Sequence, residues 1–498
     1  MRKIICLSIF LVFAAAFQAA AWNGESGWHG TRWHESSAEE SAIAYGVRWD
    51  QANDTYTEGI IDSGTFIGQD VTTFPVQEQM RRCVLQDSGT VNYYLGASDS
   101  TKKANGDAAT LDGTDGQVMV EIPDFYYVQA QYSDYRYFFV ADGPFTLTLP
   151  DSSEVEASLH PAFTKAGASV DYRYVGAYQA NIYDDSASGY VGGDVGWDTA
   201  NDQMASVSGV LPAVDFDRGD GRTLAENRGS GWHQLDANLW AAVNLLYVTE
   251  YADLNAQDKI GAGITDYAAW PGGPQALGGN SNGIGNATGN DTWAVNKWSA
   301  ETAYSLGDEC IPDASQTGYT YRVTSAGTTG ATEPTWPTTL GNTVVDGAVT
   351  WECVRTTQYM SYRGIENWYG HIWQFIDAAN IHNSAANGSR LYTCGNYENY
   401  ADDTDTNYTL AGSLAESDGY ITDVVDAVGF WPVSTGGGSA TYLCDYYYTF
   451  YDSDADSGWR VAPFGGYVYY GAPAGPFCVY SSIGSSFSIS HFGGRLCF

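Results

Sequence analysis

Two acidic runs have a residue spacing that a calcium ion could use. YDSDADSGW at 451–459 places aspartates at alternate positions before a glycine, and DDTDTN at 402–407 has a similar spacing. Alternating carboxylates open calcium loops of the EF-hand type, but such loops close with a glutamate at the twelfth position, which neither run has. We interpret both runs as solvated turns, and we expect no metal site and no cofactor.

Catalytic patterns have little support in this chain. The sequence contains no serine-hydrolase elbow, no HExxH helix and no phosphate-binding P-loop. Glu250 and Glu366 lie in apolar segments, where capping or core hydrogen bonding is more common than acid–base work. Cys478 and Cys497 are 19 residues apart and do not form a closely spaced thiol pair. We therefore expect a protein that is not an enzyme.

The C-terminal tail, GGYVYYGAPAGPFCVYSSIGSSFSISHFGGRLCF at 465–498, is rich in side chains suited to non-covalent contact. Tyrosine offers a large, rigid contact area at a modest cost in entropy, and serine and glycine add adaptable hydrogen bonding. In SFSISH (486–491), alternation predicts an extended segment with three serines on one side and Phe487, Ile489 and His491 on the other. The alternative for each aromatic residue is a place in the core of a β domain. The predicted ligand-binding residues are Tyr467, Tyr469, Tyr470, Pro473, Tyr480, Ser482, Phe487, Ile489 and His491.

Charge limits the partners of the chain. Among its 498 residues, 59 acidic and 22 basic side chains give a formal net charge of -37. Such a surface repels nucleic acid and anionic membranes, so we exclude nucleic-acid binding. The hydrophobic content of 44% is ordinary, which favours a folded protein with an ample core.

The N-terminus has the pattern of a secretory signal peptide. Arg2 and Lys3 precede an apolar run, and the small residues 19–21 precede Trp22, which predicts cleavage after Ala21. The alternative is a membrane anchor, and no later run is apolar enough to span a bilayer. We expect a secreted or bacterial cell-surface protein that does not contact the membrane once the signal is removed. A place in a virion tail is the alternative if the signal does not operate.

Periodicity predicts two helices and many short strands. Asp236 can cap a helix over Asp236–Tyr251, and Trp368–Ala379 has an apolar stripe of helical spacing. Elsewhere short runs such as QVMVEI and YRYFFVA alternate between turn residues. This combination predicts an α+β fold with few helices, many short strands and long loops.

A segment at 293–356 stands apart from the rest of the chain. It has its own tryptophans, a turn-rich middle, and flanking stretches suited to be linkers. We predict a small all-β inserted module, which a Cys310–Cys353 disulfide would suit. WSAETAYSLGDECI (298–311) and GYTYRV (318–323) resemble small carbohydrate-binding modules, although core tryptophans of a tiny β domain are the alternative. The possible carbohydrate-binding residues are Trp298, Tyr304, Trp336 and Trp351.

The remaining motifs occur in an order that resembles a known family. The motifs are, in chain order, YGVRWD (45–50), SGWHQLDANLWAAVNLLYVTEY (230–251), YRGIENWYGHIW (362–373), GWRVA (458–462) and GGRL (493–496). The last two frame a stretch of the tail in which the residue type varies from position to position. The chain resembles the C-type lectin-like variable proteins that are the targets of diversity-generating retroelements, a group that includes phage tropism determinants. The resemblance implies a C-type lectin-like domain with a hypervariable C-terminal face that binds a cell-surface protein or glycan.

The composition of the tail agrees with this resemblance. Such systems copy template adenines to random bases, which turns AAC-type codons into NNC codons that never encode Lys, Glu, Gln, Met or Trp. These five types make up 62 of the 498 residues, a share that predicts about five in a stretch of 39. The 39 residues after Trp459 contain none of them. Chance in a tail rich in Gly, Ser and Tyr is the alternative explanation.

The expected organisation has five parts. These are a signal peptide (1–21), an N-terminal segment (22–75), and two parts of the C-type lectin-like domain (76–292 and 357–498) around the insert (293–356). We expect an exported receptor-recognition or adhesion protein. The alternatives are a fixed adhesin that grips carbohydrate with the insert, and an enzyme of the formylglycine-generating type, whose family shares this fold and uses cysteines near the C-terminus.

Overall fold

The computed structural model describes residues 42–498 except 195, 266–271, 275, 291–295, 314–318, 340, 357–358, 426–428 and 450–456. The predicted signal peptide and most of the acidic run at 451–459 lie outside the described residues. Within the described part, no helix is both long enough and apolar enough to cross a membrane.

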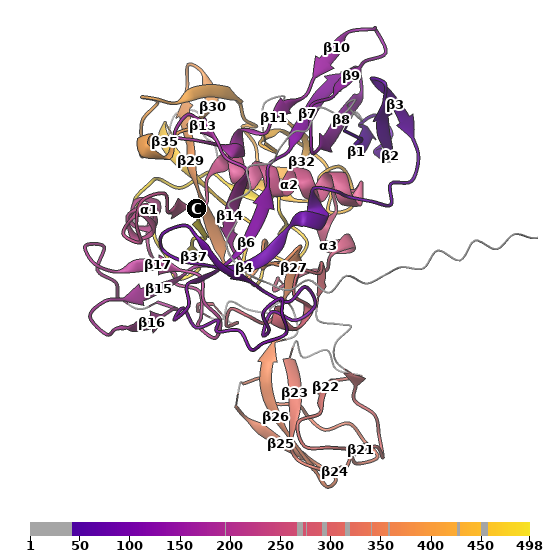
Figure 1. Cartoon of the computed structure of the whole chain (residues 1–498), viewed down its shortest axis with the longest axis vertical. Helices are drawn as coiled ribbons and strands as arrows, with labels where there is room; N and C mark the ends of the chain where they lie inside the picture. Colours follow the sequence, from indigo (N-terminus) through magenta and orange to yellow (C-terminus); the bar gives the residue numbers. More distant parts are fainter. Residues whose placement is uncertain are drawn as a thin grey trace, which may run out of the picture. The chain divides into compact units, whose positions relative to one another are not determined.

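Strands dominate the described chain (Figure 1). Helix is confined there to three segments, which are α1 (Arg218–Glu226), α2 (Ala237–Tyr251) and α3 (Ala256–Lys259). The expected α+β class is therefore wrong, and the fold is predominantly β. One cause is the second predicted helix, which is instead the start of strand β29 (Trp373–Ser384). A continuous apolar run fits a strand covered on both faces as well as it fits a helix.

The first predicted helix is confirmed as α2. The Asp236 side chain accepts a hydrogen bond from the backbone N–H of Leu239 at 2.8 Å, which caps the helix N-terminus. At the other end, Ala252 takes a left-handed conformation that stops the helix. The helix is buried on nearly every side and contacts strands of two different sheets, so it is a central core element rather than an amphipathic cover.

Three larger sheets surround this helix. The N-terminal sheet has the order β11-β7-β8-β1-β2-β3, with β1 Ala44–Asp50, β2 Thr55–Asp62, β3 Thr65–Gly68, β7 Tyr126–Tyr132, β8 Tyr135–Ala141 and β11 Ser158–Leu159. The central sheet has the order β18-β38-β14-β6-β4-β5, with β4 Arg81–Leu85, β5 Val91–Tyr94, β6 Gln117–Pro123, β14 Tyr172–Gly176, β18 His233–Gln234 and β38 Leu496–Cys497. Because β1 pairs with β8, the N-terminal sheet joins residues on both sides of the boundary expected at 75.

The third sheet contains most of the C-terminal region. Its order is β31-β30-β29-β35-β36-β34-β32-β33, with β37 paired to β29 in parallel. Its strands besides β29 are β30 Gly388–Thr393, β31 Thr409–Ser413, β32 Gly419–Val424, β33 Pro432–Thr435, β34 Tyr446–Tyr448, β35 Gly458–Phe464, β36 Val479–Tyr480 and β37 Phe492–Gly493.

Two further sheets have three strands each. One is a three-stranded sheet of β15 (Asn181–Asp184), β16 (Gly189–Val191) and β17 (Gln203–Ala205). The other pairs β19 (Gly289–Asn290) with β27 (Met360–Tyr362), and β27 with β28 (Ile365–Glu366). Since β19 and β27 lie before and after the predicted insert, the chain returns to a neighbouring strand after the intervening segment.

The segment between β19 and β27 has its own strands and its own core. Its five-stranded sheet has the order β20-β22-β23-β26-β25, in which the neighbours from β22 onward lie side by side in Figure 1. The strands are β20 Asn296–Lys297, β22 Glu309–Ile311, β23 Tyr319–Ser325, β25 Thr343–Asp346 and β26 Val349–Thr356, with a separate pair of β21 Ala303–Tyr304 and β24 Gly327–Thr328. A hydrophobic cluster drawn only from this segment fills the space under the sheet.

The suggested Cys310–Cys353 disulfide is wrong. Both cysteines are buried free thiols, as are the other five from Cys83 to Cys497. Tyr321 pairs with Cys310 on one side and with Cys353 on the other, so two strand spacings of about 4.8 Å separate the cysteines. A disulfide requires Cα atoms within about 7 Å of each other, so this register forbids the bond.

Arg495 ties the end of the chain to the rest of the fold. Its side chain is fully buried and carries hydrogen bonds to the Gln374 side chain at 2.7 Å and to the Gly176 carbonyl at 2.7 Å. Its remaining contacts are the carbonyls of Glu366 and Asn367 at 2.8 and 2.9 Å. Burial lowers the pKa of Arg495 to about 9, so the charge depends on these acceptors for its stabilisation.

Replacing Arg495 should destabilise the whole unit. Arg495→Gln leaves several buried carbonyls without a donor, and we expect the free energy of unfolding to fall by about 3 kcal/mol or more. Urea denaturation followed by tryptophan fluorescence measures this change. Arg322→Gln is the control, because Arg322 pairs with Glu309 at an exposed position where about 0–1 kcal/mol is expected. Equal losses in the two variants would contradict the anchoring role.

Candidate functional site

Strands β34 and β36 place tyrosines on one face of the third sheet. Tyr447 pairs with Val479, and both side chains are fully buried in the core. Because side chains alternate along a strand, Tyr446, Tyr448 and the cross-strand partner Tyr480 point to the opposite face. These three residues are only half-buried, so this face is partly open while the other face forms the core.

Ring contacts extend this face into the C-terminal tail. The Tyr448 ring lies 5.8 Å from Tyr480 and 5.1 Å from Tyr470, measured between ring centroids. Tyr470 lies 4.6 Å from Tyr467, which in turn stacks on His491 at 4.4 Å. Such spacings fall in the range where aromatic pairs attract beyond simple burial. We call the following set the aromatic face: Tyr420, Tyr446, Tyr448, Tyr467, Tyr469, Tyr470, Tyr480, Phe487, Ile489 and His491.

The aromatic face rests on a buried floor. Trp373 and Phe492, which are 1% and 2% exposed, stack on each other at 6.0 Å where β29 pairs with β37. The Trp373 ring also contacts Tyr470 at 5.4 Å and Tyr480 at 5.7 Å. The floor therefore combines Trp373 of the long strand β29 with Phe492 of the tail, and the layer above it comes from the tail and from strands β32 and β34.

The loops of the tail are held by α2 and by one buried acid. The indole of Trp240 and the amide of Asn244, both on α2, donate to the Pro476 carbonyl at 3.2 and 3.1 Å. The Asp445 carboxylate accepts the Phe477 backbone N–H at 2.8 Å, and burial raises the pKa of Asp445 well above its ordinary value. Any Cβ at residue 475 would meet this carboxylate at 2.0 Å, so Gly475 is required by the close approach.

The predicted ligand-binding residues differ in their exposure. Tyr469 and Phe487 are the most open, at 50% and 37% exposed, whereas Tyr467 is 8% exposed and belongs partly to the floor. Pro473 is half-buried, and its carbonyl accepts the Tyr446 backbone N–H at 3.1 Å. The other predicted residues are all half-buried: Tyr470, Tyr480, Ser482, Ile489 and His491.

The predicted alternation in SFSISH is wrong. The segment is not a strand, because the Phe487 N–H bonds to the Gly484 carbonyl at 3.2 Å and the Phe492 N–H to the Ile489 carbonyl at 2.9 Å. These local turns place Phe487 outward beside its neighbouring serines, while Ile489 packs toward the core. The serines and the other three residues of this segment therefore do not lie on opposite sides of an extended chain.

Sequence reasoning missed the part of the site that lies upstream of the tail. Tyr420, Tyr446 and Tyr448 lie upstream of the tail, and Trp373 stands inside a motif that the sequence assigns to the scaffold. The aromatic run DYYYTF at 445–450 has high β-propensity and could have predicted a strand, but three identical tyrosines do not tell which of them face outward. Nothing local connects these residues to Tyr480, since their adjacency depends on parallel pairing between β34 and β36.

The tryptophans of the insert form its core. Trp298, Trp336 and Trp351 are 8%, 6% and 0% exposed. Both Trp298 and Trp351 donate their indole N–H to Asp346, at 2.7 and 3.1 Å. Their ring faces therefore pack in the core of the insert, which was the alternative to carbohydrate binding. Tyr304 is half-buried against Trp351 and is the only one of the four with appreciable open surface.

The cysteines named for the enzyme alternative are poorly placed for reaction. Cys478 and Cys497 are both fully buried. Cys478 lies just before β36 of the third sheet, and Cys497 lies in β38 of the central sheet. Burial raises the pKa of both thiols well above the ordinary value, which disfavours the reactive thiolate. Among the described residues, no group of acids, cysteines and histidines is arranged to hold a metal ion. No protein-family model matches this chain, and no curated protein is similar to it in sequence.

Substitutions should affect stability differently in the exposed residues of the aromatic face and in its buried floor. Because Tyr469 and Phe487 are open, Tyr469→Ser and Phe487→Ser should each change the free energy of unfolding by less than about 1 kcal/mol. Trp373→Ala should lower it by about 3–5 kcal/mol, because it leaves a large cavity. Urea denaturation of the three variants makes the comparison. A large loss in both serine variants would show that these residues are structural.

His491 should remain neutral at physiological pH. Burial against the aromatic face lowers its pKa from 6.5 to about 4. Because the folded-state pKa lies below the unfolded one, the contribution of His491 to stability is complete above pH 6.5 and falls as the pH drops toward 4. An NMR titration of the imidazole, assigned with His491→Gln, should give a midpoint near 4. A midpoint near 6.5 would show that the ring is solvated.

Proposed function

We propose that this chain is an exported ligand-binding protein that recognises a cell-surface protein or glycan through the aromatic face. The observation that carries the proposal is the layering of this site. Open aromatic residues such as Tyr469 and Phe487 rest on a floor formed by Trp373 of β29 and Phe492 of the tail, so the upper layer can change while these two rings stay packed. Rigid aromatic side chains on a fixed scaffold are typical of adaptable binding surfaces.

Diversification of the tail is part of this proposal. The residues after Trp459 lack every amino acid that NNC codons cannot encode. The anchors of the tail are Arg495, which lies in the motif GGRL, and Gly475, which faces Asp445. Among the open residues, Phe487 lies between these anchors and Tyr469 lies just before them. A variable target protein of a diversity-generating retroelement needs this separation of anchor and variable position.

We propose no catalytic role. The buried, protonated state favoured for Cys478 and Cys497 argues against the formylglycine-generating alternative. The packed tryptophans of the insert argue against a fixed adhesin that grips carbohydrate with them.

Sequencing the DNA beside this gene tests the proposal. We expect a near-copy of the segment encoding residues 459–498 next to a reverse-transcriptase gene, with mismatches only where the copy carries adenine. Those mismatches should fall on codons of the open residues and should spare Arg495 and Gly475. If there is no such copy, or if mismatches occur at all four bases, the tail is a fixed surface and the diversification is wrong.

A displayed library tests the binding face itself. NNC codons at Tyr469, Tyr470, Tyr480 and Phe487 should yield folded variants that bind a chosen target such as hen lysozyme. A matched library at Tyr132 and Tyr172, outside the aromatic face, is the control. Binders from the first library alone support the assignment, whereas equal success or equal failure in both would contradict it.

A further inference from the structure

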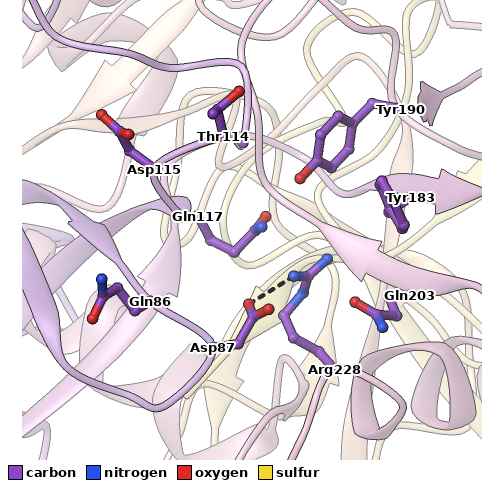
Figure 2. A pocket seen from close by; sticks show the side chains of 11 residues that line it. Gln86, Asp87, Thr114, Asp115, Gln117, Tyr183, Tyr190, Gln203 and Arg228 are labelled. Carbon is purple, nitrogen blue, oxygen red and sulfur yellow. Dashed lines mark hydrogen bonds and ion pairs between the residues drawn. The ribbon is translucent and has the colours of Figure 1, made fainter. Parts of the chain in front are cut away.

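A polar cleft of about 490 Å³ lies apart from the aromatic face. The hairpin of β15 and β16 forms one wall, and the chain segments after β4 and before β6 form the other (Figure 2). Its volume falls within the range of about 300–1,000 Å³ typical of small-molecule sites. The residues around it are Gln86, Asp87, Gly113, Thr114, Asp115, Gly116, Gln117, Tyr183, Tyr190, Gln203 and Arg228.

Arg228 has an unused donor in this cleft. Its Nε donates to the Met204 carbonyl at 2.7 Å and its Nη1 to the Asp87 carboxylate at 2.8 Å. Among the described residues Nη2 has no hydrogen-bond partner, and this atom is itself enclosed in a residue that is only 7% exposed. Figure 2 shows the guanidinium pointing toward the space between Gln117, Tyr190 and Gln203. A buried, unpaired donor is costly, and a ligand oxygen would satisfy it.

The surrounding side chains are held in position. Gln117 is fixed because its Oε1 accepts the Ser206 backbone N–H at 2.8 Å. The rings of Tyr183 and Tyr190 meet edge to face at 5.2 Å across paired strands. Gly113 has a φ of +89°, and a Cβ there would lie 2.1 Å from the Tyr190 hydroxyl, so only glycine admits this ring.

The charge and chemistry of the lining select the class of ligand. Asp87 pairs with Arg228, and Asp115 accepts the Tyr93 hydroxyl at 2.8 Å, so the two acids outnumber the one base. This balance repels an anion. The remaining donors and acceptors are amides and a hydroxyl, next to tyrosine rings that can stack on C–H groups. A neutral polyhydroxylated ring matches both features.

We propose that this cleft binds a neutral sugar unit, with Arg228 and Gln203 bonding to its hydroxyls and Tyr183 contacting its ring. The site shares no residue with the aromatic face or with the insert. It therefore goes beyond the proposed function and does not depend on whether the tail is diversified.

The full chain should be tested by saturation-transfer NMR and calorimetry. The probes are the methyl glycosides of glucose, galactose, mannose and N-acetylglucosamine, with glucuronate as the anionic comparison. At least one neutral glycoside should bind more tightly than glucuronate. Binding of no neutral probe at millimolar concentration, or a preference for glucuronate, would overturn the proposal.

Variants locate the binding within the molecule. Gln203→Ala and Arg228→Lys should each lower the affinity for the glycoside roughly two- to ten-fold, which is the effect of losing one net hydrogen bond. Tyr183→Ala should also weaken binding. Gln203→Ala and Tyr183→Ala both keep the Arg228–Asp87 ion pair, so they still test the site if the Arg228→Lys variant does not fold. Gln131→Ala and Tyr132→Ala are the matched controls outside the cleft. Unchanged affinity in Gln203→Ala and Tyr183→Ala, or loss only in Tyr304→Ala of the insert, would overturn the assignment.

Discussion

The fold depends on a buried charge that has no carboxylate partner. Arg495 is fully enclosed, and its donors are satisfied by the Gln374 side chain and by backbone carbonyls from two distant segments. Such a group is tolerated only when every donor has an acceptor, which makes the geometry of those segments interdependent. The last residues of the chain thereby fix the position of β29, and β29 supplies Trp373 to the floor of the aromatic face.

A similar logic governs the loops above that floor. Asp445 and α2 hold the tail by its backbone atoms, through the Phe477 N–H and the Pro476 carbonyl. This backbone anchoring holds the buried turn in place, which leaves open positions such as Tyr469 and Phe487 less constrained. The aromatic face thus combines a strict scaffold with a more open surface, and the proposed ligand-binding function rests on this combination.

Two chemically different surfaces result. The aromatic face offers flat rings and few charges, which suits broad contact with a macromolecule. The cleft beside Arg228 offers fixed polar groups around a small volume, which suits one compact, neutral ring. The strongly acidic surface of the chain, at a net charge of -37, opposes anionic partners at both sites.

The sequence by itself determined the many short strands and helix α2 with its Asp236 cap, although the α+β class inferred from them was wrong. These features follow from local periodicity, capping chemistry and composition. The helix expected over Trp368–Ala379, the extended SFSISH segment and the Cys310–Cys353 bond were wrong, because burial on both faces, local turns and strand register are not encoded within a short window. Only the tertiary structure decided that Tyr448, Tyr480 and Trp373 meet and that Arg228 keeps an unused donor. These are long-range contacts, and their geometry is set by the pairing of strands from distant parts of the chain.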